Sequence, residues 1–171
     1  MDDNPPNRGT EDRIPPSSGR WPTGGWHDGG MELSQALDFA RSHPRSVLVT
    51  LRADGRPQLS NVLHWVDDEG LVRISTTADR AKYVNLRRSQ WAALHVTSQD
   101  FWSYAVLEGP VEVTEPAAAA DDAVVDELVA YYRAANGEHD DWDDYRAAMV
   151  RDRRAIVRLR PDHAYGALGD G

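Results

Sequence analysis

The first regular element expected from the pattern of apolar positions is a helix that begins near residue 33. A set of apolar residues falls on one side of that helix because its members lie three or four positions apart: Leu33, Ala36, Leu37 and Ala40. Pro44 disfavours the helical conformation at the residue before it. We therefore expect the helix to end by His43.

After this helix the pattern becomes typical of strands. Residues Val47–Leu51 are apolar and mostly β-branched, Asp54-Gly55 is a hairpin signal, and Gln58–Val66 resumes a strand pattern. The two runs are thus expected to pair in the antiparallel sense. Further strands are expected at residues 71–76, 91–97, 102–113 and 155–159, with a bend in the third of these at Gly109-Pro110.

Three more helices are expected between these strands. One covers residues 79–88, a second carries an apolar face and ends near Gly137, and a third begins near Asp141. Five or six antiparallel strands in a meander, with inserted helices, indicate an α+β protein built on a small closed or nearly closed barrel. We expect this domain to span residues 31–171.

Residues 1–30 differ in composition from the rest of the chain. They hold five of the ten prolines and six of the thirteen glycines, and few branched apolar residues. Such a segment buries too little apolar surface to build a core. We expect residues 1–30 to be a disordered tail.

The composition excludes several classes of function. The 171-residue chain has no cysteine, which removes disulfides, thiolate metal sites and cysteine nucleophiles. Its net charge of −9 argues against binding of nucleic acid or anionic membranes. No run of eighteen apolar residues occurs, and the first twenty residues do not resemble a secretion signal, so a cytoplasmic location is expected.

Against this acidic background, one stretch of the chain is basic. Residues 73–90 carry five cations against the single acid Asp79, whereas residues 121–146 carry nine acids against two arginines. In the basic stretch, Arg80 and Lys82 fall where a strand ends and a helix begins. Cations are unfavourable at the positive end of a helix, and a bound phosphate would resolve the conflict.

Lys82 is the only lysine beside eighteen arginines, which favours a role that needs a compact charge. The alternative is a solvated surface helix with Asp79 as its N-cap and a chance lysine. Arg80 and Lys82 also lie about 200° apart around an ideal helix, so a shared phosphate requires the helix to begin later. The residues alone leave both interpretations open.

The strand from residue 55 to 62 is the second candidate for ligand contact. Its small and amide side chains leave the backbone approachable by a planar ligand, with Gln58, Ser60 and Val62 on one face and Leu59 and Asn61 on the other. An ordinary hairpin strand with a polar outer face explains the same pattern.

Four spaced motifs together resemble a known family. They are Gly55-Arg56-Pro57-Gln58-Leu59-Ser60-Asn61-Val62, Asp79-Arg80-Ala81-Lys82 with Asn85-Leu86-Arg87-Arg88, Trp102-Ser103-Tyr104-Ala105-Val106 with Glu108-Gly109, and Gly137-Glu138-His139 through Trp142-Asp143-Asp144-Tyr145-Arg146 to Asp152-Arg153-Arg154. In this order the chain resembles the actinobacterial F420-dependent (deazaflavin) branch of the pyridoxamine-phosphate-oxidase-like split-barrel group. The resemblance runs from Leu33 to Gly166.

The resemblance implies an FMN-binding split β-barrel with peripheral helices, assembled as a homodimer with cofactor sites at the subunit interface. The implied cofactor is coenzyme F420, with FMN as the alternative, and the clustered Arg87 and Arg88 favour the longer, more acidic F420. Contacts to the ring are implied for Gln58, Ser60, Asn61 and Val62. Contacts to the phosphate, the ribityl chain or the acidic tail are implied for Ser75, Thr76, Arg80, Ala81, Lys82 and Asn85.

Trp102 and Arg146 are interpreted as contributions from the partner chain, with core packing and a surface ion pair as their respective alternatives. The implied activity is hydride transfer from reduced F420 to a small planar conjugated acceptor, and the cofactor carries the chemistry. An FMN-dependent oxidase and a non-catalytic flavin or F420 carrier remain as alternatives.

Metal and hydrolytic chemistry are not expected. The six histidines are scattered without ligand spacing, and the acidic run from Glu138 to Asp144 is explained by a helix start with Asp141 as its cap. Ser60 and Ser103 lack the surroundings of a catalytic serine.

Overall fold

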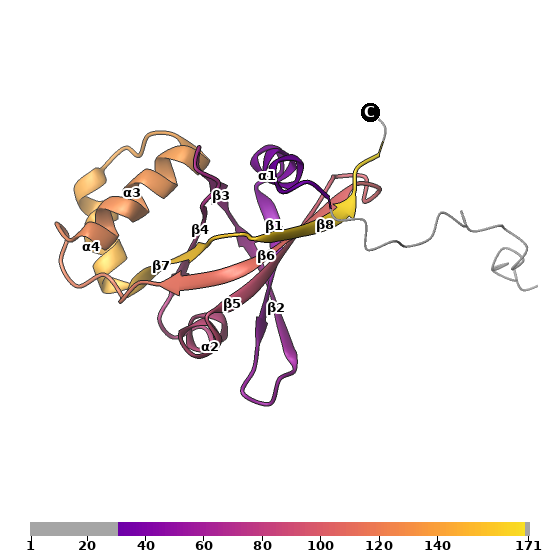
Figure 1. The fold of residues 1–171 in the computed structure, drawn as a ribbon. Helices are drawn as coiled ribbons and strands as arrows, with labels where there is room; N and C mark the ends of the chain where they lie inside the picture. Colours follow the sequence, from indigo (N-terminus) through magenta and orange to yellow (C-terminus); the bar gives the residue numbers. More distant parts are fainter. Residues whose placement is uncertain (1–30, 170–171) are drawn as a thin grey trace, which may run out of the picture.

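The computed structural model describes residues 31–169, so the expected tail at residues 1–30 lies outside the described residues. Within this range the chain forms four helices and eight strands (Figure 1). The helices are α1 Leu33–Ser42, α2 Ala81–Ser89, α3 Ala123–Asn136 and α4 Trp142–Arg151. The strands are β1 Arg45–Leu51, β2 Pro57–Leu63, β3 Trp65–Val66, β4 Val72–Thr77, β5 Trp91–Thr97, β6 Tyr104–Val113, β7 Arg154–Leu159 and β8 His163–Ala167.

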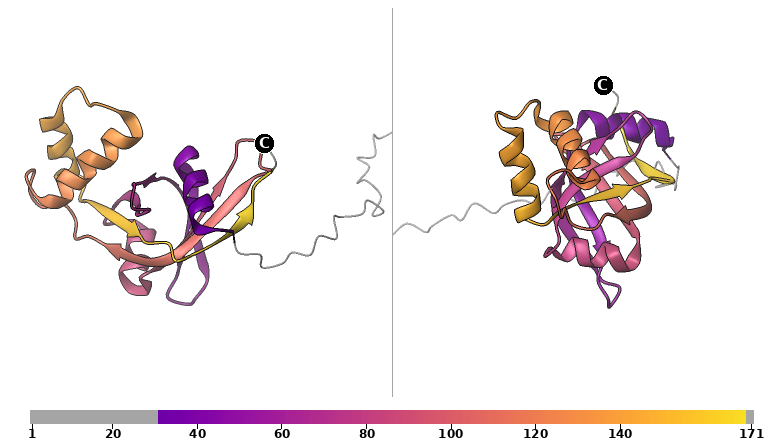
Figure 2. Two further views of the ribbon diagram at one scale, coloured as in Figure 1. Left: turned by 45° about the horizontal axis from the view of Figure 1, so that its top comes forward. Right: turned by 90° about the vertical axis from the view of Figure 1, so that its left-hand side faces the viewer.

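All strand pairs are antiparallel, and the strands follow the order β2-β1-β5-β6-β7-β4-β3, with β8 beside β6. The sheet curls around a common core as a split barrel (Figure 2). The α+β fold class expected from the sequence is therefore confirmed. The expected meander is wrong, because β5 pairs with β1 and β7 pairs with β4. Local patterns identify strands but do not choose between distant partners.

β6 is the strand that joins the two parts of the sheet. It pairs with β5 through Pro110 and with β7 from Val111 onward, so it changes partner where the sequence predicted a bend. A Cβ atom on Gly109 would lie 2.3 Å from the Arg160 carbonyl oxygen, so no larger residue fits there. This close approach brings the chain into β8, a short strand that the sequence analysis did not predict.

The expected strand Gln58–Val66 is interrupted at His64, which separates β2 from β3. The His64 side chain is 2% exposed. Its Nε2–H donates to the Ala40 carbonyl oxygen (3.1 Å), which leaves Nδ1 to accept from the Ser46 hydroxyl (2.8 Å). Burial lowers the pKa of His64 to about 4, and the hydrogen bond to Ala40 acts in the opposite direction.

Two groups of buried side chains hold the structure together. The barrel core consists of aliphatic residues from α1, α2 and the strands, among them Leu48, Ile74, Leu94, Leu107 and Leu159. A smaller cluster joins α3 and α4 to the barrel and includes Val125, Leu128, Tyr131, Met149 and Ile156. The two helices form a hairpin at the end of the sheet remote from β8 (Figure 1). Between residues 31 and 169 no helix is long and apolar enough to cross a membrane.

Candidate functional site

The barrel has a seam where β2, at one end of the strand order, approaches β4 near the other end. A cavity of about 350 Å³ opens at this seam. β2 and β4 supply one part of its lining, α2 and β7 supply two cations, and the α3–α4 hairpin supplies aromatic side chains. The lining residues are Asn61, Val62, Leu63, Ser75, Lys82, Tyr131, Tyr132, Tyr145, Met149 and Arg154. We call this cavity the seam pocket.

Tyr131 of α3 links the hairpin to the seam. Its side chain is largely buried, and its hydroxyl donates a hydrogen bond to the Leu63 carbonyl oxygen of β2 (3.0 Å). Burial raises the pKa of the Tyr131 phenol, against the opposing effects of the Ser75 backbone and the Arg154 charge. The neutral phenol is therefore retained at neutral pH, and it donates to β2 beside β4.

The first turn of α2 borders the seam pocket. The helix begins at Ala81, two residues later than the sequence predicted, and Arg80 rather than Asp79 is the N-cap. In the described chain this helix start has no side-chain cap and no acidic residue in its first turn. The Asp79 carboxylate instead accepts a hydrogen bond from the Thr77 hydroxyl. The unpaired N–H groups and the helix dipole thus favour an anion at this position.

Lys82 is half-buried and lines the pocket beside this helix start. Its pKa is lowered by burial and by the positive charges of Arg80 and Arg154. In the part of the chain that the structure describes, Lys82 has no ion-pair partner. Its environment disfavours the charged amine unless an anion is present.

Arg154, at the start of β7, is a site residue that the sequence reasoning missed. Its Nη1 donates to the Ser75 hydroxyl (3.2 Å), while its Nε is buried without a hydrogen-bond acceptor among residues 31–169. The register that places Arg154 opposite Thr77 brings it to the α2 side of the pocket. The adjacent pair Arg153-Arg154 was visible in the sequence, but only the β4–β7 pairing shows where it lies.

Arg80, Lys82, Arg153 and Arg154 form a cationic cluster. The charges of Arg80 and Arg154 act on Lys82, and those of Arg80 and Arg153 act on Asp79. A phosphate fits this cluster, since it would supply acceptors for the Arg154 Nε and for the α2 N–H groups.

The structure brings together four of the residues predicted to contact the cofactor, namely Asn61, Val62, Ser75 and Lys82. Arg80 and Ala81 are exposed at the α2 start, next to Lys82. The other barrel residues that were predicted to contact the cofactor do not line the seam pocket. They are Gln58, Ser60, Thr76 and Asn85.

Gln58, Ser60 and Asn85 belong to a polar network under α2. The Asn85 amide donates to the Thr50 hydroxyl (3.1 Å), which donates to the Gln58 Oε1 (3.0 Å). The Gln58 amide donates to the Ser60 hydroxyl (2.7 Å). Thr76 is buried, and its hydroxyl has no hydrogen-bond partner among the described residues.

The two residues predicted to act across an interface lie apart from the seam pocket. Trp102 is 83% exposed in the turn between β5 and β6, so it does not pack in the core of its own chain. Arg146 on α4 forms an ion pair with Asp126 (2.7 Å) and donates to the Ala120 carbonyl oxygen (2.8 Å). Their contribution to a partner chain remains a prediction.

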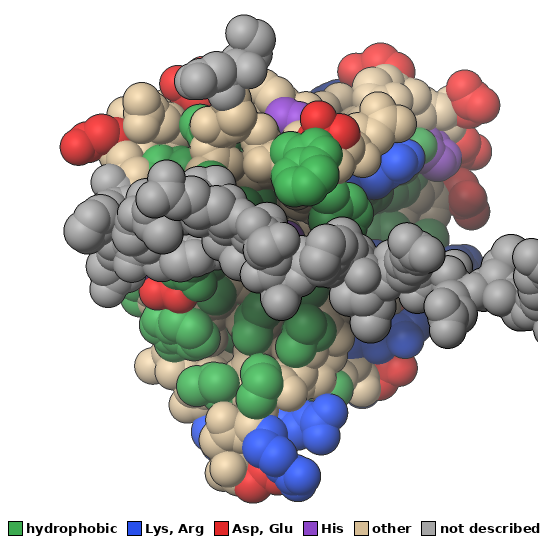
Figure 3. Space-filling view, turned by 90° about the vertical axis from the view of Figure 1, so that its right-hand side faces the viewer, with side chains coloured by type: hydrophobic (Ala, Val, Ile, Leu, Met, Phe, Trp, Pro, Cys, Tyr) green, Lys and Arg blue, Asp and Glu red, His purple; other side chains and the backbone are tan. Residues whose placement is uncertain are grey.

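An apolar surface adjoins the seam pocket on the outer side of β1, β2 and β5. A shallow depression of about 450 Å³ lies there and shares Asn61, Val62 and Leu63 with the seam pocket. Leu59, Phe101 and Trp102 are among the large apolar residues exposed in this structure. Apolar side chains gather on the side of the molecule that Figure 3 shows, with basic side chains at the tip below them.

The strand order and the curled antiparallel sheet define a protein of the split-barrel class. Residues 33–167 match the protein-family model described as pyridoxamine 5'-phosphate oxidase. The chain belongs to this family.

Solved structures agree with the fold. A conserved hypothetical protein from Mycobacterium tuberculosis aligns with 82% of this chain and 92% of its own, at 20% identity and a TM-score of 0.62. An F420 reductase aligns with 73% of this chain and 92% of its own, at 24% identity and a TM-score of 0.54. The haem storage protein from Vibrio cholerae aligns with 79% of this chain and 94% of its own, at 14% identity and a TM-score of 0.58. At these identities the similarity shows the fold alone.

Proposed function

We propose that this protein is an F420-dependent reductase that holds the phosphate end of the coenzyme at the cationic cluster. The observation that carries the proposal is the concentration of Arg80, Lys82, Arg153 and Arg154 around Asp79 in a chain of net charge −9. When bound, the coenzyme supplies a hydride for a planar conjugated acceptor. The protein supplies charge, orientation and a partly enclosed pocket.

The number of cations favours F420 over FMN. Arg87 pairs with Glu115, and Arg88 donates to the Leu51 carbonyl oxygen, so these two arginines are already engaged. The exposed Arg80 and Arg153 are the cations left to meet further negative charge beside Lys82 and Arg154. One phosphate needs fewer cations than this cluster offers, whereas an acidic tail that continues outward would use the exposed pair.

We further propose that the active species is a homodimer formed through the apolar surface beside the seam pocket. The large exposed side chains of Leu59, Phe101 and Trp102 favour association with a second copy. Sedimentation at micromolar concentration is expected to give a dimer. A stable monomer at that concentration would count against this assembly.

The decisive experiment compares four ligands on the purified full chain: F420, FMN, FAD and hemin. Binding is measured by fluorescence for the flavin-type cofactors and by absorbance for hemin. We expect F420 to bind most tightly, and its affinity to fall more steeply with salt than that of FMN, because more exposed charge pairs are screened. Tight FMN binding with weak F420 binding would favour the FMN-dependent alternative, and hemin binding alone would remove the proposal.

Variants of Lys82 locate the phosphate. Lys82→Ala is expected to weaken F420 binding by roughly 1.5 to 3 kcal/mol, the range for hydrogen bonds to charged groups. Lys82→Arg keeps the charge but loses the compact geometry, so a smaller loss is expected. Arg52→Ala, an exposed cation in the β1–β2 hairpin, is the matched control. If Lys82→Ala binds F420 as tightly as the unmodified protein, the phosphate site lies elsewhere.

A further inference from the structure

The seam pocket is lined by two chemically different sets of side chains from different elements. Lys82 and Arg154 come from α2 and β7 and form its cationic side, and the α3–α4 hairpin contributes its aromatic side, Tyr131, Tyr132 and Tyr145 with Met149. The charge of Arg154 acts on both Tyr131 and Tyr145, so the two sets adjoin. The Tyr131 hydroxyl donates to the Leu63 carbonyl oxygen (3.0 Å), and the Tyr145 hydroxyl donates to the Leu128 carbonyl oxygen (3.1 Å). These two phenols are therefore fixed by the main chain and offer a ligand mainly their rings.

Tyr132 differs from its two neighbours because its hydroxyl has no hydrogen-bond partner among the described residues. Its ring is nevertheless held in place. It contacts the rings of Tyr145, His139 and Trp142, with centroids 5.0, 5.3 and 5.8 Å away. Such edge-to-face contacts fix the orientation of an aromatic side chain. Tyr132 thus combines a fixed ring with a free hydroxyl at the pocket.

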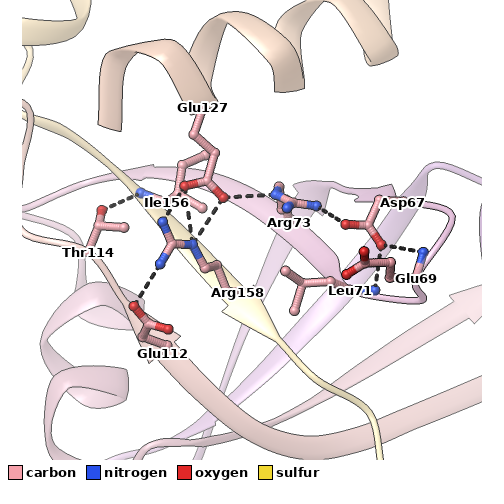
Figure 4. Close-up of polar contacts among 9 residues, drawn as sticks. All are labelled: Asp67, Glu69, Leu71, Arg73, Glu112, Thr114, Glu127, Ile156 and Arg158. Atoms are coloured by element: carbon pink, nitrogen blue, oxygen red, sulfur yellow. Dashed lines mark hydrogen bonds and ion pairs between the residues drawn. The ribbon is translucent and has the colours of Figure 1, made fainter. Parts of the chain in front are cut away.

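The hairpin that carries these tyrosines is tied to the barrel by an ion network (Figure 4). Glu127 of α3 accepts hydrogen bonds from Arg73 Nε of β4 (2.8 Å) and from Arg158 Nε of β7 (3.0 Å). Arg73 also pairs with Asp67, and Arg158 with Glu112 (2.6 Å). The Glu127 side chain is only 14% exposed.

Tyr131 follows Glu127 by four residues, so both side chains lie on the same face of α3. The ion network therefore holds the aromatic side of the pocket at a set distance from its cationic side. We call the rings of Tyr131, Tyr132 and Tyr145 the aromatic wall of the pocket. A rigid aromatic wall suits a flat ligand, because the ligand can stack only on a surface that keeps its position.

We propose that Tyr132 is a specificity-determining residue of an acceptor subsite in the seam pocket, which takes a neutral, planar, conjugated carbonyl compound. The rings of the hairpin cover one face of the compound, and the Tyr132 hydroxyl donates a hydrogen bond to its carbonyl oxygen. This inference rests on the proposed function, since it leaves Lys82 and Arg154 to the coenzyme.

A neutral acceptor is favoured for an electrostatic reason. Once the coenzyme occupies the cations, the acidic segment Glu138–Asp144, which follows α3 and begins α4, leaves a net negative charge on the hairpin, because Arg133 pairs with only one of its five acids, Glu138 (3.0 Å). An anionic acceptor would be repelled by this segment. The apolar and aromatic lining favours the uncharged form of the same ring system.

The test uses 2-methyl-1,4-naphthoquinone as the neutral probe and 1,4-naphthoquinone-2-sulfonate as its anionic counterpart. Calorimetry measures the binding of each probe to the full chain, with and without F420, and fluorescence measures the binding of F420. Tyr132→Phe removes only the hydroxyl, and Tyr132→Leu also removes the ring. Tyr165→Phe, on β8 and outside the seam pocket, removes a hydroxyl elsewhere and is the control.

We expect Tyr132→Phe to weaken binding of the neutral quinone about threefold to tenfold, the effect of one neutral hydrogen bond. Tyr132→Leu should weaken it more, and both variants should bind F420 within about twofold of the unmodified protein. The control should bind both ligands normally. With F420 bound, the sulfonate should bind more weakly than the neutral quinone.

The outcomes separate this inference from the proposed function. If Tyr132→Leu loses F420 as strongly as it loses the quinone, the aromatic wall belongs to the coenzyme and the inference is overturned. The same holds if the quinone does not bind, or if neither Tyr132 variant affects it. Equal binding of the sulfonate and the neutral quinone would overturn the inference that the acceptor is uncharged. If the quinone binds through Tyr132 but F420 does not bind at all, the subsite stands and the proposed function fails.

Discussion

The barrel and the α3–α4 hairpin are held together by different kinds of contact. The largest fully buried side chains of the barrel are almost all aliphatic, such as Leu48, Ile74, Leu94 and Leu107. The hairpin is joined to the barrel by a smaller apolar cluster, by the Tyr131 hydroxyl that donates to a carbonyl oxygen of β2, and by the carboxylate of Glu127 between two arginines.

This difference matters because the seam pocket lies between the two regions. Apolar packing is not directional, so the barrel tolerates changes that conserve volume. Hydrogen bonds and ion pairs are directional, so they set the orientation of the tyrosines that face the cations. The comparison indicates that variants of the barrel should change mainly stability, whereas variants of the hairpin should change the pocket.

The largest effect is expected for Leu94→Ala in the barrel core. Leu94 is fully buried on β5, and loss of its side chain should cost about 3 kcal/mol of the free energy of unfolding, within the range of roughly 2 to 5 for such substitutions. Urea denaturation measures this loss. Leu128→Ala in the hairpin cluster is the matched variant, and its loss should be smaller because that cluster is smaller and relaxes more easily.

The two leucine variants also test whether the hairpin, rather than the barrel, shapes the pocket. The Leu128 side chain packs in the hairpin cluster with Tyr131 and Tyr145, so Leu128→Ala should disturb the aromatic wall and weaken quinone binding to the folded protein. Leu94→Ala should leave quinone binding unchanged below the denaturation midpoint. A reversed pattern would mean that the barrel, rather than the hairpin, shapes the pocket.

The second largest effect is a loss of stability at acid pH, caused by the buried His64 of the barrel. The pKa of His64 is lowered from 6.5 to about 4 in the folded protein by burial. The unfolded chain then binds a proton before the folded chain does, so stability is fully present above pH 6.5 and falls as the pH is lowered toward 4. About 2 kcal/mol should be lost by pH 5. Urea denaturation at pH 7.5 and pH 5 tests this, and equal midpoints would contradict it.

Most of the fold could be predicted from the sequence because strands and helices carry local signals. Trp91–Thr97 is rich in apolar residues, and it forms β5 with the predicted bounds. β8 lacked such a signal, since His163–Ala167 contains a glycine and no β-branched residue. Its place depends on the close approach of Gly166 to β6, where a Cβ atom would lie 2.2 Å from the Tyr104 carbonyl oxygen. Only the tertiary structure shows that contact.

The cationic half of the candidate site had a local signal, and the aromatic half did not. Lys82 was identifiable as the only lysine and as a cation at a helix start. Tyr131, Tyr132 and Tyr145 follow the spacing of helix core positions, which explains them without a ligand. Their proximity to Lys82 depends on the path of the chain from β6 through α3 and α4 to β7, and no local pattern encodes that path.

The third effect is that of Glu127→Gln in the ion network. The substitution keeps the shape of the side chain but leaves Arg73 and Arg158 without their shared carboxylate. For this largely buried side chain we expect a loss of about 1 to 2 kcal/mol, between the values for surface and buried pairs. Thermal denaturation measures it. Glu112→Gln, whose carboxylate pairs with Arg158 but is 71% exposed, is the control and should have little effect.

The pH dependence of this variant sharpens the test. Hydrogen bonds from Arg158 and Arg73 outweigh burial and lower the pKa of Glu127 below 4.5. The unmodified protein should therefore keep the contribution of Glu127 above pH 4.5 and lose it as the pH falls further. Glu127→Gln should lack that part of the acid sensitivity. If the difference in stability between the two proteins is the same at pH 7 and pH 3, the network does not act through the charge of Glu127.

The smallest effect is expected for Asp122→Ala at the start of α3. The Asp122 carboxylate accepts hydrogen bonds from the backbone N–H groups of Val125 (2.8 Å) and Ala118 (2.8 Å), so it caps the helix and fixes the preceding turn. Loss of an N-cap costs about 1 kcal/mol. Because Glu127 and Tyr132 are anchored further along α3, quinone binding should change less than twofold while the midpoint of thermal denaturation falls by a few degrees. Asp122→Asn keeps a capping oxygen and should recover most of the loss. If Asp122→Ala weakened quinone binding by much more than twofold, the helix start rather than the ion network would hold the hairpin in place beside the pocket.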